Sequence, residues 1–111
     1  MLVVEDEAII ALAIEDMLRE LGCEVAGTAM TLGVAEEIAR EEAFDAALLD
    51  INLNGDTSEV VAETLRSRGI PFCFSTGYGS ADVPLGFEDV PLLQKPYNAA
   101  TLAAVLERLL A

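Results

Sequence analysis

The chain has 111 residues, 53% of them hydrophobic, which predicts one compact domain over residues 1–111 with a sizeable core. Its formal net charge of −14 argues against direct binding to nucleic acid or to an anionic membrane, because both need clusters of lysine and arginine. The sequence has no histidine, which excludes histidine-based catalytic triads, zinc sites with histidine ligands and imidazole acid–base catalysis.

The first part of the chain contains a predicted strand and a predicted helix. Residues 2–4 form a short apolar run, which is typical of a buried strand. A helix is predicted from Glu7 to Leu21, and Gly22 ends it. The apolar residues that recur in this helix at helical spacing are Ile9, Leu12, Ala13, Met17 and Leu21.

The middle of the chain continues the alternation of strands and helices. The predicted elements, in chain order, are a strand at 24–28, a helix at 32–41, a strand at 45–50, a loop at 52–56 and a helix at 58–67. Thr31 is the expected N-cap of the first of these helices, and Gly69 follows the second. The strand between them is apolar until it reaches Asp50.

The last part of the chain departs from this alternation. The predicted elements are a strand at 71–75, a strand at 91–94 and a helix at 99–110 that Asn98 caps. Between the two strands, Gly79, Pro84, Gly86 and Pro91 interrupt every apolar period. A fourth helix in residues 78–91 is therefore expected to be short or disordered.

Together these elements predict the fold class. Five strands that alternate with helices give βαβ units and a parallel sheet. Parallel strands that are covered on both faces are almost continuously apolar, as these strands are. The sequence therefore predicts a doubly wound, five-stranded α/β fold.

Polar side chains follow four of the predicted strands. They are Glu5, Asp6 and Glu7 after the first strand, Asp50 and Asn52 after the third, Ser75 and Thr76 after the fourth, and Lys95 after the fifth. Ligand sites in open α/β sheets lie beyond the carboxyl ends of the strands, so we expect these side chains along one edge. Carboxylates gathered there would repel one another unless a cation joined them, and oxygen ligands suit Mg²⁺. Asp50 is also a possible nucleophile, with Thr76 and Lys95 as partners for phosphoryl oxygens.

This arrangement resembles the receiver domain of two-component response regulators over essentially the whole chain. The resemblance is carried by Val3-Val4-Glu5-Asp6-Glu7, Leu48-Leu49-Asp50-Ile51-Asn52, Ser75-Thr76-Gly77 and Lys95-Pro96. Each motif alone is weak, but the four in this order, at the ends of the right strands, are specific. The resemblance implies a flavodoxin-like, CheY-like sheet with the strand order 2-1-3-4-5.

The resemblance also implies roles for the residues that follow the first and third strands. Asp50 would accept a phosphoryl group from a histidine kinase. Asp6 and Asp50 would ligate Mg²⁺, Asn52 would add its backbone carbonyl, and Glu5 would act through water. The protein would then be a phosphorylated signalling switch and not an enzyme, with chemistry limited to its own phosphorylation and dephosphorylation.

Further roles follow from the resemblance for the last two strands. Thr76 and Lys95 would engage the phosphoryl oxygens, and the Lys95–Pro96 peptide bond would be cis. Leu92 occupies the position where receivers often carry a tyrosine or phenylalanine that turns inward on phosphorylation. Tyr78 lies two residues after Thr76, at a position that tunes the lifetime of the acyl phosphate.

One subgroup of receivers is similar to this chain in the run from Pro71 to Gly79. The "FAT GUY" receivers carry a Phe-Ala-Thr-Gly motif, and Ser75 replaces the alanine here while Tyr78 follows Gly77 directly. Members of this subgroup are often stand-alone and pair with HWE-type histidine kinases. Asn52 is a second expected tuning position.

The two cysteines, Cys23 and Cys73, are far apart in the sequence. The family strand order separates their strands by three spacings, roughly 14 Å at about 4.8 Å each, so they are not expected to form a disulfide. The first residues are unlike a signal peptide, and no apolar run approaches the roughly 20 residues of a membrane-spanning helix. We therefore expect a cytoplasmic, reducing location.

Each candidate residue also has a structural interpretation. The acids at 5–7 could be a solvated helix start, Asp50 a loop residue and Thr76 an ordinary strand-end hydroxyl. Lys95 is the only lysine in the chain, which composition alone could explain. The occurrence of all four features together favours the site.

The last helix leaves two interpretations open for its outer face. Leu106 and Leu110 lie off the main apolar stripe of this helix. They could make a partly exposed apolar helix. They could instead form a surface for a partner or for a weak homodimer.

Two further functional classes are alternatives to the signalling switch. An aspartyl-phosphate phosphohydrolase of small substrates also uses a strand-end aspartate and Mg²⁺, but commonly has a second aspartate two residues later. That position is Asn52, which does not transfer a proton in the same way. A degenerate receiver that only binds proteins is the third class. The switch could act as a stand-alone receiver with a phosphotransfer or output partner, or as a piece of a longer regulator.

Overall fold

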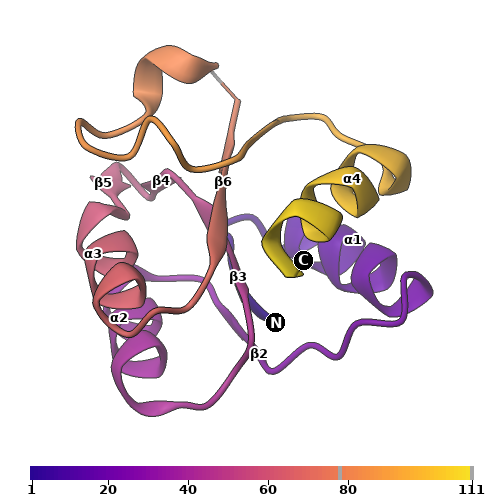
Figure 1. Ribbon diagram of the computed structural model, residues 1–111, viewed down its shortest axis with the longest axis horizontal. Helices are drawn as coiled ribbons and strands as arrows, with labels where there is room; N and C mark the ends of the chain where they lie inside the picture. Colours follow the sequence, from indigo (N-terminus) through magenta and orange to yellow (C-terminus); the bar gives the residue numbers. More distant parts are fainter. Residues whose placement is uncertain (78, 111) are drawn as a thin grey trace.

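The chain folds around a central parallel sheet, seen nearly edge-on in Figure 1. The structure is a computed structural model that describes residues 1–77 and 79–110. In these residues, five strands form one parallel sheet in the order β2-β1-β3-β6-β7. They are β1 (Leu2–Val4), β2 (Gly27–Ala29), β3 (Ala47–Asp50), β6 (Phe72–Thr76) and β7 (Leu92–Gln94). The predicted doubly wound fold and strand order 2-1-3-4-5 are confirmed, with β6 and β7 as the fourth and fifth strands.

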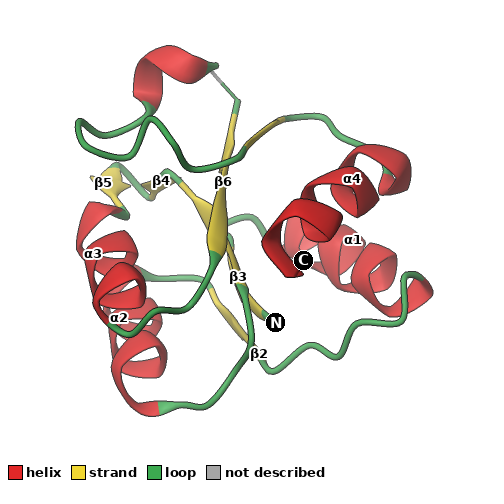
Figure 2. Cartoon of the chain, in the orientation of Figure 1, coloured by secondary structure: helices red, strands yellow, loops and turns green. Residues whose placement is uncertain are grey.

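Helices cover both faces of the sheet (Figure 2). They are α1 (Ala8–Glu20) and α4 (Ala99–Leu110) on one face, and α2 (Leu32–Glu41) and α3 (Glu59–Ser67) on the other. Alternate side chains of each strand point to opposite faces. Leu48 and Cys73 therefore join the core beneath α1 and α4, whereas Leu49 and Phe74 join the core beneath α2 and α3.

Two predicted caps fix where helices begin. The Thr31 hydroxyl accepts a hydrogen bond from Val34 N at 3.3 Å, and the Asn98 side chain accepts one from Thr101 N at 2.9 Å. Each cap satisfies a backbone N–H that has no partner within its own helix. Among the described residues no helix is long and apolar enough to cross a membrane.

The buried face of α1 is not the one that the recurring apolar residues indicated. Ile9 and Leu12 are 84% and 60% exposed, while the side chains of α1 that enter the core are Ala11, Ile14 and Leu18. This helix is apolar around most of its circumference, so its own sequence supports more than one apolar stripe. Packing against the sheet decides which of them is buried.

A similar correction applies to α4. Leu106 is only 5% exposed and packs in the core beneath α1 and α4, so it is not available as a partner surface. Leu110, by contrast, is 47% exposed. The apolar arc of α4 is wide enough for Val105 and Leu106 to be buried side by side.

Two predicted segments differ from the structure by more than two residues or in the type of element. Strand β2 begins at Gly27 rather than at residue 24, because its ladder with β1 starts where Leu2 pairs with Gly27. The segment predicted as a loop at 52–56 contains a small antiparallel hairpin of β4 (Asn52–Leu53) and β5 (Asp56–Thr57). Asn54 and Gly55 form its turn with φ of 51° and 89°, the positive values that two-residue hairpin turns favour.

The segment between β6 and β7 has no α-helix among its described residues. It contains one short 3₁₀ turn, η1 (Ser80–Asp82), and otherwise follows an irregular path, as the glycines and prolines predicted. Phe87 anchors it, because this side chain is only 5% exposed and its ring lies 6.2 Å from that of Phe72 and 5.9 Å from that of Phe74. Leu85, two residues earlier, is 88% exposed.

The anchor generates a test of stability. Phe87→Ala should lower the free energy of unfolding by about 3–5 kcal/mol, because it removes a buried aromatic ring and leaves a cavity. Leu85→Ala in the same segment should change it by less than about 0.5 kcal/mol. Urea unfolding followed by circular dichroism would measure both, and equal effects of the two substitutions would contradict this role of Phe87.

Candidate functional site

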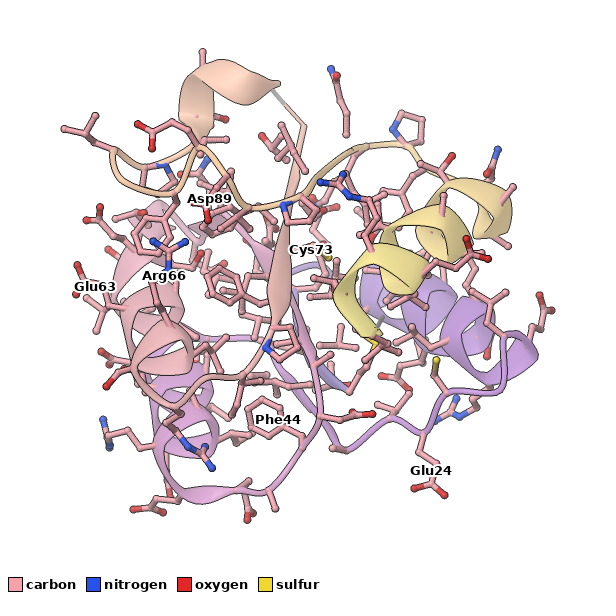
Figure 3. The ribbon with its side chains drawn as sticks, in the orientation of Figure 1. Glu24, Phe44, Glu63, Arg66, Cys73 and Asp89 are labelled. Carbon is pink, nitrogen blue, oxygen red and sulfur yellow. The ribbon has the colours of Figure 1, made fainter. Side chains whose placement is uncertain are left out.

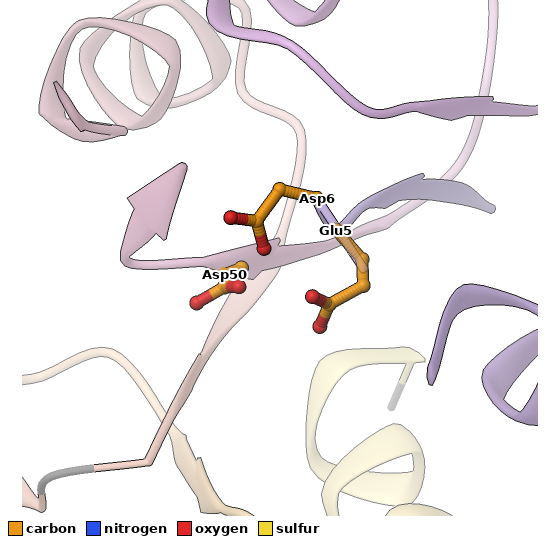
Figure 4. A group of neighbouring side chains, drawn as sticks. All are labelled: Glu5, Asp6 and Asp50. Carbon is orange, nitrogen blue, oxygen red and sulfur yellow. The ribbon is translucent and has the colours of Figure 1, made fainter. Parts of the chain in front are cut away.

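The predicted site residues meet at the carboxyl edge of the sheet. Strands β1 and β3 are neighbours, with Val4 paired to Leu49, so the residues that end them lie side by side. Oxygen atoms of Glu5, Asp6 and Asp50 lie within 4.8 Å of one another (Figure 4). Asp6 and Asp50 border an open pocket of about 610 Å³, whose other lining residues are Glu7, Asn52, Asn54, Gly55, Gly77 and Lys95.

Lys95 forms ion pairs with two of these carboxylates. Its Nζ lies 2.7 Å from Glu5 Oε1 and 3.0 Å from Asp50 Oδ2. Lys95 follows β7, and its backbone N–H donates to Thr76 O at 2.8 Å, which fixes the base of the side chain. The Lys95–Pro96 peptide bond is cis, as the family resemblance implied.

Burial governs the acidity of the two inner carboxyl groups. Glu5 is 1% exposed, and desolvation raises its pKa to about 7 although the Lys95 ammonium acts in the opposite direction. Burial also raises the pKa of Asp50 against the same ammonium. Burial would lower the pKa of Lys95, but its contacts with Glu5 and Asp50 outweigh this and raise it. Lys95 therefore keeps its charge between the two acids.

Asp6 has a different environment from the other two acids. Partial burial raises the pKa of Asp6, but hydrogen bonds outweigh this and lower it, chiefly the bond that its Oδ2 accepts from Asn54 N at 2.9 Å. Asn54 is a site residue that the sequence reasoning missed. Its signal was the Asn54-Gly55 pair, a common hairpin turn, placed four residues after Asp50.

Asn52 lies beside Asp50, two residues further along the chain. Its backbone N–H donates to Asp50 Oδ1 at 3.3 Å, and its side chain is exposed at the pocket. One oxygen of Asp50 is thus held by Asn52 and the other by Lys95. The role of the Asn52 carbonyl as a metal ligand stays a prediction.

Thr76 and Leu92 lie on β6 and β7, the two strands that follow β3 in the sheet. Thr76 ends β6 and is 1% exposed, and its Oγ1 donates to Asp82 Oδ2 at 3.0 Å. Leu92 is half-buried on β7, where it pairs in register with Phe74. Tyr78, the predicted tuning residue, lies outside the described residues. Both cysteines are free thiols.

The donor set at the edge fits a divalent cation. Three carboxylates within 4.8 Å of one another supply only oxygen ligands, and the pocket beside them leaves space for water. Mg²⁺ prefers one or two carboxylates with several waters, so Asp6 and Asp50 could hold it. Lys95 already neutralises part of the charge of Glu5 and Asp50.

Two solved structures are similar to nearly the whole chain. SdrG from Sphingomonas melonis Fr1 is 42% identical, with a TM-score of 0.88 over 99% of this chain and 94% of that chain. The BeF₃-activated conformation of SdrG from Pseudomonas melonis Fr1 is 41% identical, with a TM-score of 0.84 over the same shares. The fold and the sequence therefore agree along nearly the full length.

A longer relative matches over one of its parts. The phyllosphere-induced regulator PhyR from Methylorubrum extorquens is 32% identical over 114 residues, covering 98% of this chain but only 42% of PhyR. The family model of the response regulator receiver domain matches residues 1–107. The motifs that end β1, β3, β6 and β7 are the ones on which the resemblance rested. The chain belongs to the response regulator receiver domain family.

Proposed function

We propose that this receiver accepts a phosphoryl group on Asp50 from a histidine kinase, with Mg²⁺ bound, and changes conformation to signal to a partner. The observation that carries the proposal is the position of the Asp50 carboxylate. It lies between Asp6, which follows the neighbouring strand β1, and the Lys95 ammonium, 3.0 Å away, and it borders the open pocket. The pocket gives a phosphoryl group a route to this carboxylate.

The proposed chemistry is the transfer of a phosphoryl group from a histidine nitrogen of the kinase to a carboxylate oxygen of Asp50. A carboxylate oxygen of Asp50 attacks the phosphorus of a phosphohistidine, the new oxygen–phosphorus bond forms, and the nitrogen–phosphorus bond breaks to release the imidazole. The Lys95 ammonium and the Asn52 N–H hold Asp50 in place. Lys95 would also stabilise the added negative charge.

The acidic residues prepare the same site for a cation. Asp6 and Asp50 would hold Mg²⁺ with the Asn52 carbonyl, and Glu5 would act through water. When bound, Mg²⁺ offsets the charge of the carboxylates and of the phosphoryl oxygens. The hydrogen bond from Asn54 N keeps Asp6 oriented and its pKa low, so this carboxylate stays ionised.

The relatives support a switch more than a catalyst. SdrG exists in a BeF₃-activated conformation, and we propose an equivalent two-state behaviour for this chain. Asn52 replaces the second aspartate that a phosphohydrolase commonly uses, so we propose no turnover of external phosphate esters. An HWE-type kinase, an output or phosphotransfer partner, membership of the FAT GUY subgroup, a weak homodimer through α4 and a cytoplasmic location stay predictions.

The acceptor role can be tested by substitution. Asp50→Asn should abolish phosphorylation by acetyl phosphate with Mg²⁺, because an amide is not nucleophilic enough to replace the carboxylate. Asp56→Asn is the matched control, since it removes one exposed acid in the adjacent hairpin and should leave phosphorylation intact. Intact-mass spectrometry would measure both. Unchanged phosphorylation of Asp50→Asn would refute the assignment.

The burial of Glu5 generates a pH dependence. The pKa of Glu5 is about 7, and a cation competes with the proton that this group binds below that pH. Affinity for Mg²⁺ should therefore rise from about pH 6 to about pH 8, and Glu5→Gln should flatten that rise. Glu7→Gln removes an exposed acid at the same pocket and should preserve it.

Isothermal titration calorimetry at several pH values would measure these affinities. The rise need not vanish in Glu5→Gln, because burial also raises the pKa of Asp50. An equally steep rise in Glu5→Gln and in the unaltered chain would show that Glu5 does not couple proton release to cation binding.

A further inference from the structure

The Thr76 hydroxyl is engaged with a residue that no site motif contains. Its Oγ1 donates to Asp82 Oδ2 at 3.0 Å. Asp82 is the last residue of η1, the short turn that replaces a helix after β6, and its backbone N–H donates to Gly79 O at 3.3 Å. This places a carboxylate against the hydroxyl that the proposed switch needs.

A threonine hydroxyl has a single proton to donate. In the described structure that proton goes to a carboxylate, and hydrogen bonds to charged acceptors are stronger than those between neutral groups. A phosphoryl oxygen on Asp50 would require the same proton. The Asp82 carboxylate and a phosphoryl group on Asp50 would therefore compete for the Thr76 hydroxyl.

We propose that Asp82 is a latch, a positioning residue that holds the Thr76 hydroxyl away from Asp50 until a phosphoryl group displaces it. This inference rests on the proposed function, because the competing acceptor is the phosphorylated Asp50. The latch adds a cost to activation and favours the unphosphorylated conformation. It also links the chemistry at Asp50 to the segment that carries Asp82.

The other end of that segment is fixed to α3. Arg66 Nη1 donates to Gly86 O at 2.9 Å, its Nη2 lies 3.1 Å from Asp89 Oδ1, and its guanidinium stacks 4.4 Å from the centroid of the Phe87 ring. Figure 3 shows Arg66 and Asp89 close together beside this stretch of chain. Phe87 is itself buried in the core.

Release of Asp82 would therefore move a limited part of the chain. The start of η1 bounds this part on one side, and Phe87 with its Arg66 contacts bounds it on the other. Leu85, which is 88% exposed, lies within these limits. The signal would then be a rearrangement between η1 and Phe87, with the rest of the fold unchanged.

The latch is tested by titrating the chain with beryllofluoride and Mg²⁺. Removing a competing acceptor raises the fraction of molecules able to bind. Asp82→Ala should lower the concentration at half-saturation roughly tenfold, which corresponds to about 1.4 kcal/mol. Asp89→Ala is the matched control in the same segment, because Asp89 contacts Arg66 and should leave the half-saturation within about twofold.

A double-mutant cycle separates a latch from a merely structural turn. In Thr76→Ala the hydroxyl is absent, so adding Asp82→Ala should have no further effect on half-saturation. Without beryllofluoride, the methyl resonance of Thr76 in Asp82→Ala should shift toward its position in the saturated chain. Asp82→Asn, which keeps a weaker neutral acceptor, should fall between the unaltered chain and Asp82→Ala.

The outcomes distinguish a failure of the latch from a failure of the proposed function. If the unaltered chain binds beryllofluoride and Asp82→Ala binds it no more tightly, the latch is wrong while the proposed function stands. An effect of Asp82→Ala that persists in the Thr76→Ala background would also overturn the latch, since Asp82 would then not act through Thr76. If neither the unaltered chain nor any variant responds, the proposed function fails and the latch fails with it.

Discussion

The contact of one ammonium with two buried acids holds the functional edge of this receiver together. Lys95 Nζ lies 2.7 Å from Glu5 and 3.0 Å from Asp50, and these residues follow or end three different strands of the sheet. Without a positive charge between them, two carboxyl groups so far removed from water would favour their neutral forms. The ion pairs thus keep Asp50 fixed beside the pocket, where the proposed phosphoryl transfer requires it.

The parallel sheet makes this contact possible. In a doubly wound sheet every strand delivers its carboxyl end to the same edge, so residues far apart in sequence arrive next to one another. Val4 pairs with Leu49, and Ser75 pairs with Asp50, so the register sets the relative heights of the side chains that follow. The apolar strands beneath give this edge a rigid support, because both of their faces are covered by helices.

The segment between β6 and β7 balances this rigidity. It has no α-helix among its described residues, and its contacts with the rest of the fold include the Phe87 ring and the Val83 and Val90 side chains against the core, the contacts with Arg66, and the hydrogen bond between Thr76 and Asp82. A segment without regular secondary structure can rearrange at lower cost than the helices and strands around it. A signalling domain needs this combination of a fixed reaction site and a movable neighbour.

The sequence by itself determined which polar residues follow each strand, and these residues make up the site. Apolar runs that are followed by Glu5-Asp6, Asp50, Ser75-Thr76 and Gln94-Lys95 are local features, and the parallel topology carries their polar ends to one edge. Helix caps at Thr31 and Asn98 were equally local, since a cap acts within one turn. Only the tertiary structure decided that Ile14 and not Ile9 is buried on α1, and that Leu106 is in the core. It also decided that Asn54 N reaches Asp6 and that Thr76 donates to Asp82. The physical reason is that hydropathy and capping act along a few neighbouring residues, whereas these contacts depend on how separate segments pack.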